Sequence, residues 1–192
     1  RDGDTLLEAR LTNGSNEIIM AVRSGKAIRF PEAKVRPMGR GASGVRAMAL
    51  DTDNDEVVGM VCAASEQVSI LVVSENGYGK RTLVEDYRIT NRGGKGVKTL
   101  NVTDKTGDVI AIKDITDEDD LMITTKRGIM IRMAAADLRV MGRATQGVRL
   151  INLKSGELIA SVAKVPASEE EEGVEGAEGA VSAAEGGDGA AE

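Results

Sequence analysis

The sequence contains no histidine and only one cysteine, Cys62. A single cysteine cannot form a disulfide within the chain, and without histidine the usual zinc sites cannot be assembled from this chain alone. A Ser-His-Asp triad is excluded for the same reason. Cys62 lies in an apolar segment, so we expect it to act as a small buried hydrophobic residue. We therefore expect neither a catalytic residue nor a metal site in this chain.

Aromatic residues are also scarce, with one Phe, two Tyr and no Trp among 192 residues. Any hydrophobic core must therefore consist of Val, Ile, Leu and Met. No apolar run approaches the roughly 18 residues that a membrane-spanning helix needs, and no signal peptide is visible. These absences favour a cytoplasmic location and give no indication of a membrane partner.

The net charge of −6 conceals two regions of opposite character. Residues 168–192 contain nine acidic residues and no basic one, whereas residues 1–167 contain 25 basic and 22 acidic residues, a balance of +3. The tail is made of Glu, Gly, Ala, Ser and Val with one Asp, so we expect it to be disordered. The asymmetry indicates a body that binds a polyanion and a tail that either competes for it or only solubilises the chain.

Glycines and basic residues recur with a period of about 51 residues. Gly25, Gly77 and Gly128 are spaced by 52 and 51, and a second glycine follows each of them 19 residues later. Basic residues keep the same register in four columns. The columns are Arg29, Arg81 and Arg132; Arg36, Arg88 and Arg139; Arg40, Arg92 and Arg143; and Arg46, Lys98 and Arg149. Such a register predicts a repeat architecture.

Each repeat contains four short strand-like segments bounded by Gly, Asp and Asn turns. In the first repeat they are residues 17–22, 26–30, 45–50 and 56–62. Four strands per unit of this length are typical of a propeller blade, whereas a helical solenoid is excluded by the turn residues within every repeat. We therefore predict an all-β, propeller-like repeat array with three complete four-stranded blades.

Residues 3–9 resemble the closing segment of a repeat, as in residues 107–111, which indicates that the chain starts within a larger array. This register predicts five regions: 1–12 for the end of an upstream blade, 13–63, 64–116 and 117–167 for blades, and 168–192 for the acidic tail. Three blades are fewer than the four or more that usually close a propeller.

Positive charge is concentrated in the windows 23–46, 75–98 and 126–149, which hold 19 basic and 5 acidic residues. A basic arc on stacked blades would neutralise phosphates without reading bases, so we expect sequence-independent binding of double-stranded DNA. The alternative is a solvated charged face. The residues expected to contact DNA are Lys26, Arg29, Arg36, Arg40, Arg46, Lys80, Arg81, Arg88, Arg92, Lys95, Lys98, Arg132, Arg139, Arg143 and Arg149. The column Arg40, Arg92 and Arg143 is expected to be exposed.

Two further features have simpler interpretations. The acidic segment 117–120 could attract a divalent cation, but a solvated turn between blades is the favoured interpretation. Tyr78 lies at a hairpin tip, where it could contact DNA or cap the turn. The glycines at positions 44, 96 and 147 either satisfy a turn with positive φ or allow a phosphate to approach the backbone.

Three segments resemble the C-terminal domain of DNA gyrase A: residues 75–82 (ENGYGKRT), 35–40 with 44–46 (VRPMGR, GVR) and 140–143 with 145–148 (VMGR, TQGV). The resemblance covers residues 1 to about 167 and implies a six-bladed β-pinwheel whose neighbouring blades exchange strands. It further implies a domain that wraps DNA so that the holoenzyme can introduce negative supercoils.

The resemblance also implies an A2B2 holoenzyme with gyrase B and a second copy of gyrase A, located at the nucleoid. ATP and Mg²⁺ would be used elsewhere in that assembly, so no cofactor is expected in this fragment, which should be inert alone. Residues 92–96 match only the last five positions of the family's Gln-led signature box. The true box is expected upstream. The alternatives are the corresponding domain of topoisomerase IV or a protein-binding propeller.

Overall fold

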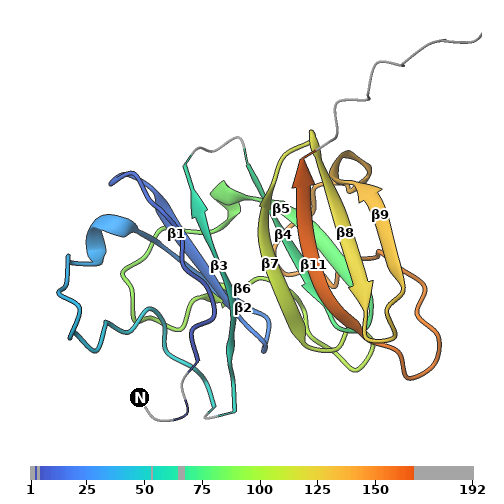
Figure 1. Ribbon diagram of the computed structural model, residues 1–192, viewed down its shortest axis with the longest axis horizontal. Helices are drawn as coiled ribbons and strands as arrows, with labels where there is room; N and C mark the ends of the chain where they lie inside the picture. The colour runs from blue at the N-terminus through green and yellow to red at the C-terminus, as the bar shows by residue number, and fades with distance from the viewer. Residues whose placement is uncertain (1–2, 4, 53, 65–67, 167–192) are drawn as a thin grey trace, which may run out of the picture.

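The computed structural model describes residues 3, 5–52, 54–64 and 68–166, and its regular elements are short β-strands with three single 3-10 turns (Figure 1). The predicted tail, residues 168–192, lies outside the described residues. The strands are β1 (Glu17–Val22), β2 (Lys26–Pro31), β3 (Val57–Ala63), β4 (Ser69–Ser74), β5 (Tyr78–Leu83), β6 (Val97–Lys98), β7 (Val109–Ile115), β8 (Asp119–Thr125), β9 (Met130–Ala134), β10 (Val148–Arg149) and β11 (Ile159–Pro166). The 3-10 turns are η1 (Glu32–Lys34), η2 (Val84–Asp86) and η3 (Ala135–Asp137).

The strands form three antiparallel sheets, which we call the first, second and third blades. Their strand orders are β3-β1-β2-β6, β10-β5-β4-β7 and β11-β8-β9. Each blade begins with a tight hairpin, β1–β2, β4–β5 or β8–β9, whose turn contains a glycine with positive φ. The predicted all-β, propeller-like fold class is confirmed.

The edge strand of a blade is contributed by the next repeat in the sequence. β6 belongs to the second repeat but pairs with β2 of the first blade, with Val97 opposite Ala27. β10 belongs to the third repeat and pairs with β5 of the second blade, with Val148 opposite Gly79. Neighbouring blades therefore share hydrogen bonds as well as an apolar interface.

This strand exchange corrects two sequence predictions. Residues 45–50 were expected to form a strand, but in the first repeat they form no strand. The equivalent strands in the other two repeats are only two residues long and pair with the preceding blade. The third blade was expected to have four strands, and within the described residues it has three.

Two mainly aliphatic clusters fill the spaces between blades, but the expectation of a core without aromatic residues is wrong, because Phe30, Tyr78 and Tyr87 are all buried. The first cluster joins the first and second blades and includes Ile19, Val61, Ile70 and Ile112. The second joins the second and third blades and includes Leu71, Ile115 and Ile123. Because each interface repeats the previous one, equivalent residues on successive repeats are brought next to each other.

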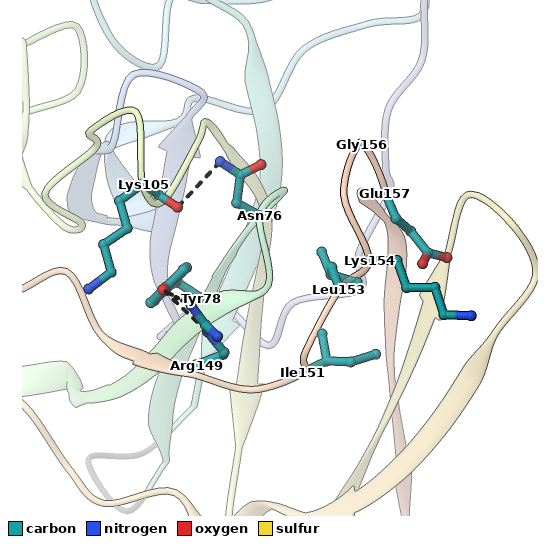
Figure 2. A pocket seen from close by; sticks show the side chains of 9 residues that line it. All are labelled: Asn76, Tyr78, Lys105, Arg149, Ile151, Leu153, Lys154, Gly156 and Glu157. Carbon is teal, nitrogen blue, oxygen red and sulfur yellow. Dashed lines mark hydrogen bonds between the residues drawn. The ribbon is translucent and has the colours of Figure 1, made fainter.

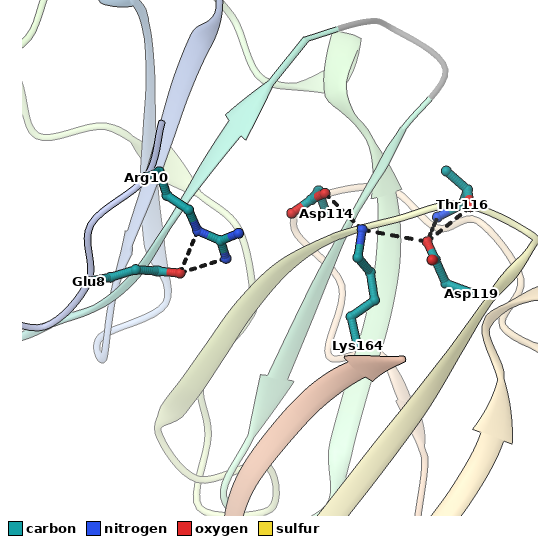
Figure 3. Close-up of polar contacts among 6 residues, drawn as sticks. All are labelled: Glu8, Arg10, Asp114, Thr116, Asp119 and Lys164. Atoms are coloured by element: carbon teal, nitrogen blue, oxygen red, sulfur yellow. Dashed lines mark hydrogen bonds and ion pairs between the residues drawn. The ribbon is translucent and has the colours of Figure 1, made fainter. Parts of the chain in front are cut away.

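Polar contacts close the junction between the second and third blades (Figure 3). Lys164, on β11, lies between the carboxylates of Asp114 on β7 and Asp119 on β8, at 3.1 and 3.8 Å. Asp119 also accepts a hydrogen bond of 2.7 Å from the backbone N–H of Thr116. The acidic segment 117–120 is therefore occupied by turn and ion-pair contacts. No helix among the described residues has the length and apolar character required to cross a membrane.

Candidate nucleic-acid interface

Each 3-10 turn leads into an irregular loop, and the three loops, residues 35–50, 87–101 and 138–152, pack against one another in sequence order. We call them the stacked loops. The amide of Ala49 donates to the carbonyl of Gly94 at 2.9 Å, and one repeat later the amide of Asn101 donates to the carbonyl of Thr145 at 3.0 Å. Equivalent positions on successive loops are thereby placed side by side.

The column Arg36, Arg88 and Arg139 is exposed on all three loops. These arginines follow the 3-10 turns by two residues in every repeat. Among the described residues, their guanidinium groups make no hydrogen bond or ion pair. An exposed guanidinium without a protein partner can donate to two oxygens of a phosphate. This column is therefore the best placed of the four to bind a polyanion.

The column Arg46, Lys98 and Arg149 is also exposed, and two of its members lie on the exchanged strands β6 and β10. Lys98 donates to the side-chain oxygen of Asn101 at 3.2 Å, and Arg149 donates to that of Asn152 at 3.1 Å. These contacts to neutral groups orient the cations without cancelling their charge. The column therefore adds positive charge beside the first.

The column Arg40, Arg92 and Arg143 was expected to be exposed, but Arg92 and Arg143 are half-buried. Arg92 donates to the backbone carbonyls of Lys34 and Arg46, at 3.0 and 3.2 Å. Arg143 donates to the carbonyl of Lys98 at 3.0 Å, which is the same contact one repeat later. These arginines hold consecutive loops together, and only Arg40 is exposed.

The column Arg29, Arg81 and Arg132 differs most from expectation, because Arg29 and Arg81 are buried. Arg29 pairs with Glu17 and donates to the carbonyls of Val84 and Tyr87 in the next blade. Arg81 likewise donates to the carbonyl of Ala135 in the third blade, at 3.1 Å. Each guanidinium thus joins a blade to the 3-10 turn of its successor and is occupied by protein acceptors. Arg132 is exposed and pairs with Asp120 at 2.5 Å.

Lys80 was expected to contact DNA, but its side chain is fully buried. Its ammonium donates to the carbonyl of Gly142 at 2.7 Å, to that of Arg143 and to the hydroxyl of Thr145. Burial, together with the positive charge of Arg143 and against the opposing influence of Asp86, lowers the pKa of Lys80 to about 8. Lys80 therefore fixes the third stacked loop from beneath.

The two remaining predicted cations share one acidic partner. Lys26, half-buried at the start of β2, and the exposed Lys95 both pair with Asp51. The hydrogen bond from Lys26 lowers the pKa of Asp51, so the carboxylate stays charged. Asp51 therefore offsets part of the positive charge of Lys26 and Lys95.

A polar pocket of about 310 Å³ lies beside the loops and contains Tyr78 (Figure 2). Arg149 donates to the phenol oxygen at 2.8 Å, which lowers the pKa of Tyr78. Lys105 lies over the same ring, 5.2 Å from its centre. Figure 2 shows the ammonium groups of Lys105 and Lys154 pointing away from each other, so the cations do not converge on one ligand. Within this pocket, the hydrogen bond from Arg149 to Tyr78 holds β10 against β5.

Sequence reasoning missed the acceptors that organise the interface. Backbone carbonyls bind Arg29, Lys80, Arg81, Arg92 and Arg143, and a carbonyl has no signature in the sequence. It also left out Lys34 and Arg127, which are exposed but lie off the repeating columns. The sequence feature that could have indicated these two residues is the local excess of basic residues in the windows 23–46 and 126–149.

Comparison with known proteins identifies the repeats. The family described as DNA gyrase C-terminal domain, beta-propeller, matches residues 16–64, 69–115 and 119–166. The chain belongs to this family. DNA gyrase A of Staphylococcus aureus (strain MRSA252) is 48% identical over 173 residues, which is 90% of this chain and 19% of the relative. The chain thus spans about one fifth of the length of that relative.

Solved structures agree with this family assignment. A structure of the DNA gyrase A C-terminal domain is 27% identical, covers 85% of this chain and 55% of its own, and superposes with a TM-score of 0.77. A crystal structure of the C-terminal domain of DNA topoisomerase IV is 26% identical, covers 82% of this chain and 49% of its own, and has the same TM-score. The C-terminal domains of DNA gyrase A and DNA topoisomerase IV therefore share the fold of this chain.

Proposed function

We propose that the stacked loops bind double-stranded DNA without sequence preference. The observation that supports this most directly is the column Arg36, Arg88 and Arg139, whose three guanidinium groups are exposed at equivalent positions of adjacent loops. Arg46, Lys98 and Arg149 add a second exposed column. Cations in regular rows neutralise phosphates and release counterions, which gives affinity that does not depend on sequence.

The repeating interface between blades also favours bending of the duplex. Each blade turns relative to the one before it, so equivalent arginines follow a curved surface and not a straight line. A duplex that touches all of them must bend, and the additional ion pairs with phosphates offset the elastic cost of a few kcal/mol. We therefore infer that this gyrase-family domain wraps DNA.

In the parent enzyme, this wrapping would support negative supercoiling by a type II topoisomerase. The proposed assembly contains gyrase B and a second copy of gyrase A, uses ATP and Mg²⁺ outside this domain, and acts on DNA in the cytoplasm. The chain itself would contribute binding and curvature, and strand cleavage would occur elsewhere in the assembly.

The test is a triple substitution, Arg36→Ala, Arg88→Ala and Arg139→Ala, measured by fluorescence anisotropy with a duplex at several salt concentrations. If the wild-type chain contacts about six phosphates, log affinity falls against log salt with a slope near −5, and losing three contacts moves that slope toward about −2 to −3. Stability should change by less than about 0.5 kcal/mol per site, because the side chains are exposed.

The matched control replaces three exposed lysines outside the stacked loops, Lys105→Ala, Lys126→Ala and Lys154→Ala. It removes the same charge and should retain most of the slope. An equal loss in both triple variants would show that net charge, and not the arginine column, determines binding. If the triple arginine variant bound the duplex with wild-type affinity, the stacked loops would not be the DNA interface.

The gyrase and topoisomerase IV domains match this chain with equal TM-scores, so similarity of fold does not distinguish between them. A direct measurement of DNA wrapping is therefore needed. Nicked circular DNA is ligated with and without the chain, and the linking number of the product is compared. A wrapping domain leaves a shift that grows with the amount of bound protein. Binding without any shift would restrict the function to DNA attachment.

A further inference from the structure

An exposed aliphatic side chain directly follows an arginine of the Arg36 column at both internal junctions between blades. Ile89, after Arg88, is 56% exposed, and Val140, after Arg139, is 47% exposed. Among the described residues, no other repeat position exposes a large aliphatic side chain in both the second and the third repeat. Described blades lie on both sides of each residue, so this exposure is a property of the junction between blades.

The backbone holds both side chains in fixed positions. Ile89 forms a parallel bridge with Arg29 of β2, and Val140 forms the same bridge with Arg81 of β5. In each case the amide of the next residue donates to the carbonyl of that arginine, at 2.8 and 2.9 Å. Isoleucine and valine are branched at Cβ, which leaves them few side-chain rotamers. Contact with a ligand would therefore cost these side chains little conformational entropy.

A small cleft lies beside Ile89 between the first and second blades. It has a volume of about 210 Å³, and its lining includes Ile89, Val84, Ala63 and Arg29. Paired residues of neighbouring strands present their side chains on the same face of a sheet, so Ile89 lies on the face of Arg29, toward the second blade. The aliphatic surface of Ile89 is therefore not isolated, because Val84 and Ala63 line the same cleft.

These aliphatic groups lie next to the cations that the proposed function assigns to phosphate. Adjacent residues have Cα atoms about 3.8 Å apart, so Ile89 and Val140 accompany Arg88 and Arg139 closely. In a duplex, every phosphate is joined to the sugars on either side of it. The C2′ atom of that sugar carries only hydrogens in DNA, whereas it carries a hydroxyl in RNA. An aliphatic side chain beside a phosphate-binding arginine therefore faces the group that distinguishes the two nucleic acids.

We propose that Ile89 and Val140 pack against deoxyribose rings and make this domain prefer double-stranded DNA to double-stranded RNA. The inference rests on the proposed DNA binding of the stacked loops and adds the sugar as a recognised group. Packing against a 2′-hydroxyl would remove its water without supplying a partner, because an aliphatic side chain neither donates nor accepts a hydrogen bond. Arginines bind the phosphates of either nucleic acid, so the selectivity depends on the aliphatic side chains.

The test compares a DNA duplex with an RNA duplex of the same sequence, by fluorescence anisotropy with the full chain at several salt concentrations. The double variant Ile89→Thr, Val140→Thr keeps the branching at Cβ and the charge, and gives each position a hydroxyl that can pair with a 2′-hydroxyl. The wild-type chain should bind the DNA duplex more tightly than the RNA duplex. The ratio of the RNA to the DNA dissociation constant should fall at least about fivefold in the variant. The salt slope on DNA should not change, because no phosphate contact is lost.

A matched control and a third duplex isolate the sugar contact. The control variant Ile129→Thr, Met130→Thr changes two exposed apolar side chains outside the stacked loops and should keep the wild-type ratio. A 2′-fluoro RNA duplex keeps the A-form but lacks the hydroxyl, so the wild-type chain should bind it more tightly than RNA. This comparison needs no variant, and thermal melting checks that both variants remain folded.

The possible results separate the sugar contact from the proposed function. A wild-type chain that binds no DNA duplex would overturn both. If the wild-type chain binds DNA but the Ile89→Thr, Val140→Thr variant keeps the same ratio, only the sugar contact is wrong. Equal binding of RNA and 2′-fluoro RNA by the wild-type chain would assign the selectivity to groove shape, and it would also overturn the sugar contact alone.

Discussion

Lys80 places an ammonium group in the interior of the second blade, where lysine is seldom found. Three oxygen acceptors from the third stacked loop surround it. Its pKa of about 8 lies below the ordinary 10.5, because burial disfavours the charged form. The same side chain therefore stabilises the position of a loop and makes the stability of the chain depend on pH.

Between pH 8 and 10.5 the unfolded chain keeps a proton on Lys80 that the folded chain has released. The free energy of unfolding should therefore rise with pH through this window as far as Lys80 is concerned. In Lys80→Met this contribution should be absent, so the stability difference between wild type and variant should shift in favour of the wild type from pH 8 to 10. Urea unfolding at four pH values measures it.

Parallel stability profiles for the two proteins would show that Lys80 titrates normally in the folded chain. A Lys80→Arg variant serves as the control, because it keeps a charge at every pH in the window. Its stability difference from wild type should widen as the pH rises, since arginine does not release its proton.

The four basic columns show how far residue roles could be predicted from the sequence. Spacing and positive charge were the same in every column, so Arg29 and Arg36 were assigned the same role. The structure separates them, because Arg29 lies on a strand facing the next blade and Arg36 lies beyond the 3-10 turn. The direction of a side chain depends on which strands pair, and that information is absent from the spacing.

At the scale of elements, the arginine clamps join one blade to the next turn. In Arg29→Met, the carboxylate of Glu17 and the carbonyls of Val84 and Tyr87 lose their donor. The free energy of unfolding should fall by about 2–3 kcal/mol, because hydrogen bonds to a charged group are lost in a buried site. Chemical denaturation of Arg29→Met measures it.

The matched control is Arg36→Met, which makes the same chemical change at an exposed position seven residues away in the sequence. It should alter stability by less than about 0.5 kcal/mol. An equally small effect of Arg29→Met would mean that water replaces the guanidinium at the carbonyls without loss.

Strand exchange gives a second prediction at this scale. Gly96→Ala and Gly44→Ala both place alanine at a positive φ, +71° and +79°. Only the first also forces a Cβ against a carbonyl oxygen, that of Ala27. Gly96→Ala should therefore be less stable than Gly44→Ala by about 1–3 kcal/mol, the usual cost of overpacking. Thermal or urea unfolding of the two variants compares them.

If the two alanine variants are equally destabilised, positive φ alone accounts for the loss and β6 moves away from β2 freely. The comparison is informative because the two glycines occupy equivalent positions in their repeats and differ in whether a receiving strand lies against them.

The elements themselves were largely predictable. Short aliphatic runs bounded by turn residues located both strands of the first hairpin, β1 and β2, because these features act locally along the chain. The partner of residues 45–50 could not be derived from the same signals. Hydrogen bonds between repeats depend on which blade lies alongside, and resemblance to a known family was the only indication of exchange.

For the whole molecule, the distribution of charge leads to a prediction about the acidic tail. Residues 168–192 carry nine negative charges and no positive one, attached to a body with a balance of +3. We expect the tail to compete with DNA for the basic loops, because a tethered chain acts at high effective concentration. A chain ending at residue 167 should bind a duplex more tightly at low salt, and the difference should shrink as salt rises.

Anisotropy titrations of both chains between about 50 and 300 mM salt test this competition. A control tail with every acidic residue replaced by Gln or Asn keeps the length and should behave like the truncated chain. Equal affinity of all three proteins at every salt concentration would make the tail a solubilising extension only.

The exchange of β6 and β10 also bears on how the protein is made. A ribosome completes the β1–β2 hairpin long before it completes β6. The end of β6, Lys98, lies 67 residues after the end of β2, Pro31. During that interval the growing chain has an open sheet edge next to other nascent chains, where mispairing is most damaging. Translation pauses inside the second repeat would lengthen the exposure of the first hairpin. Synonymous codon changes there should alter the yield of soluble protein without changing a single residue.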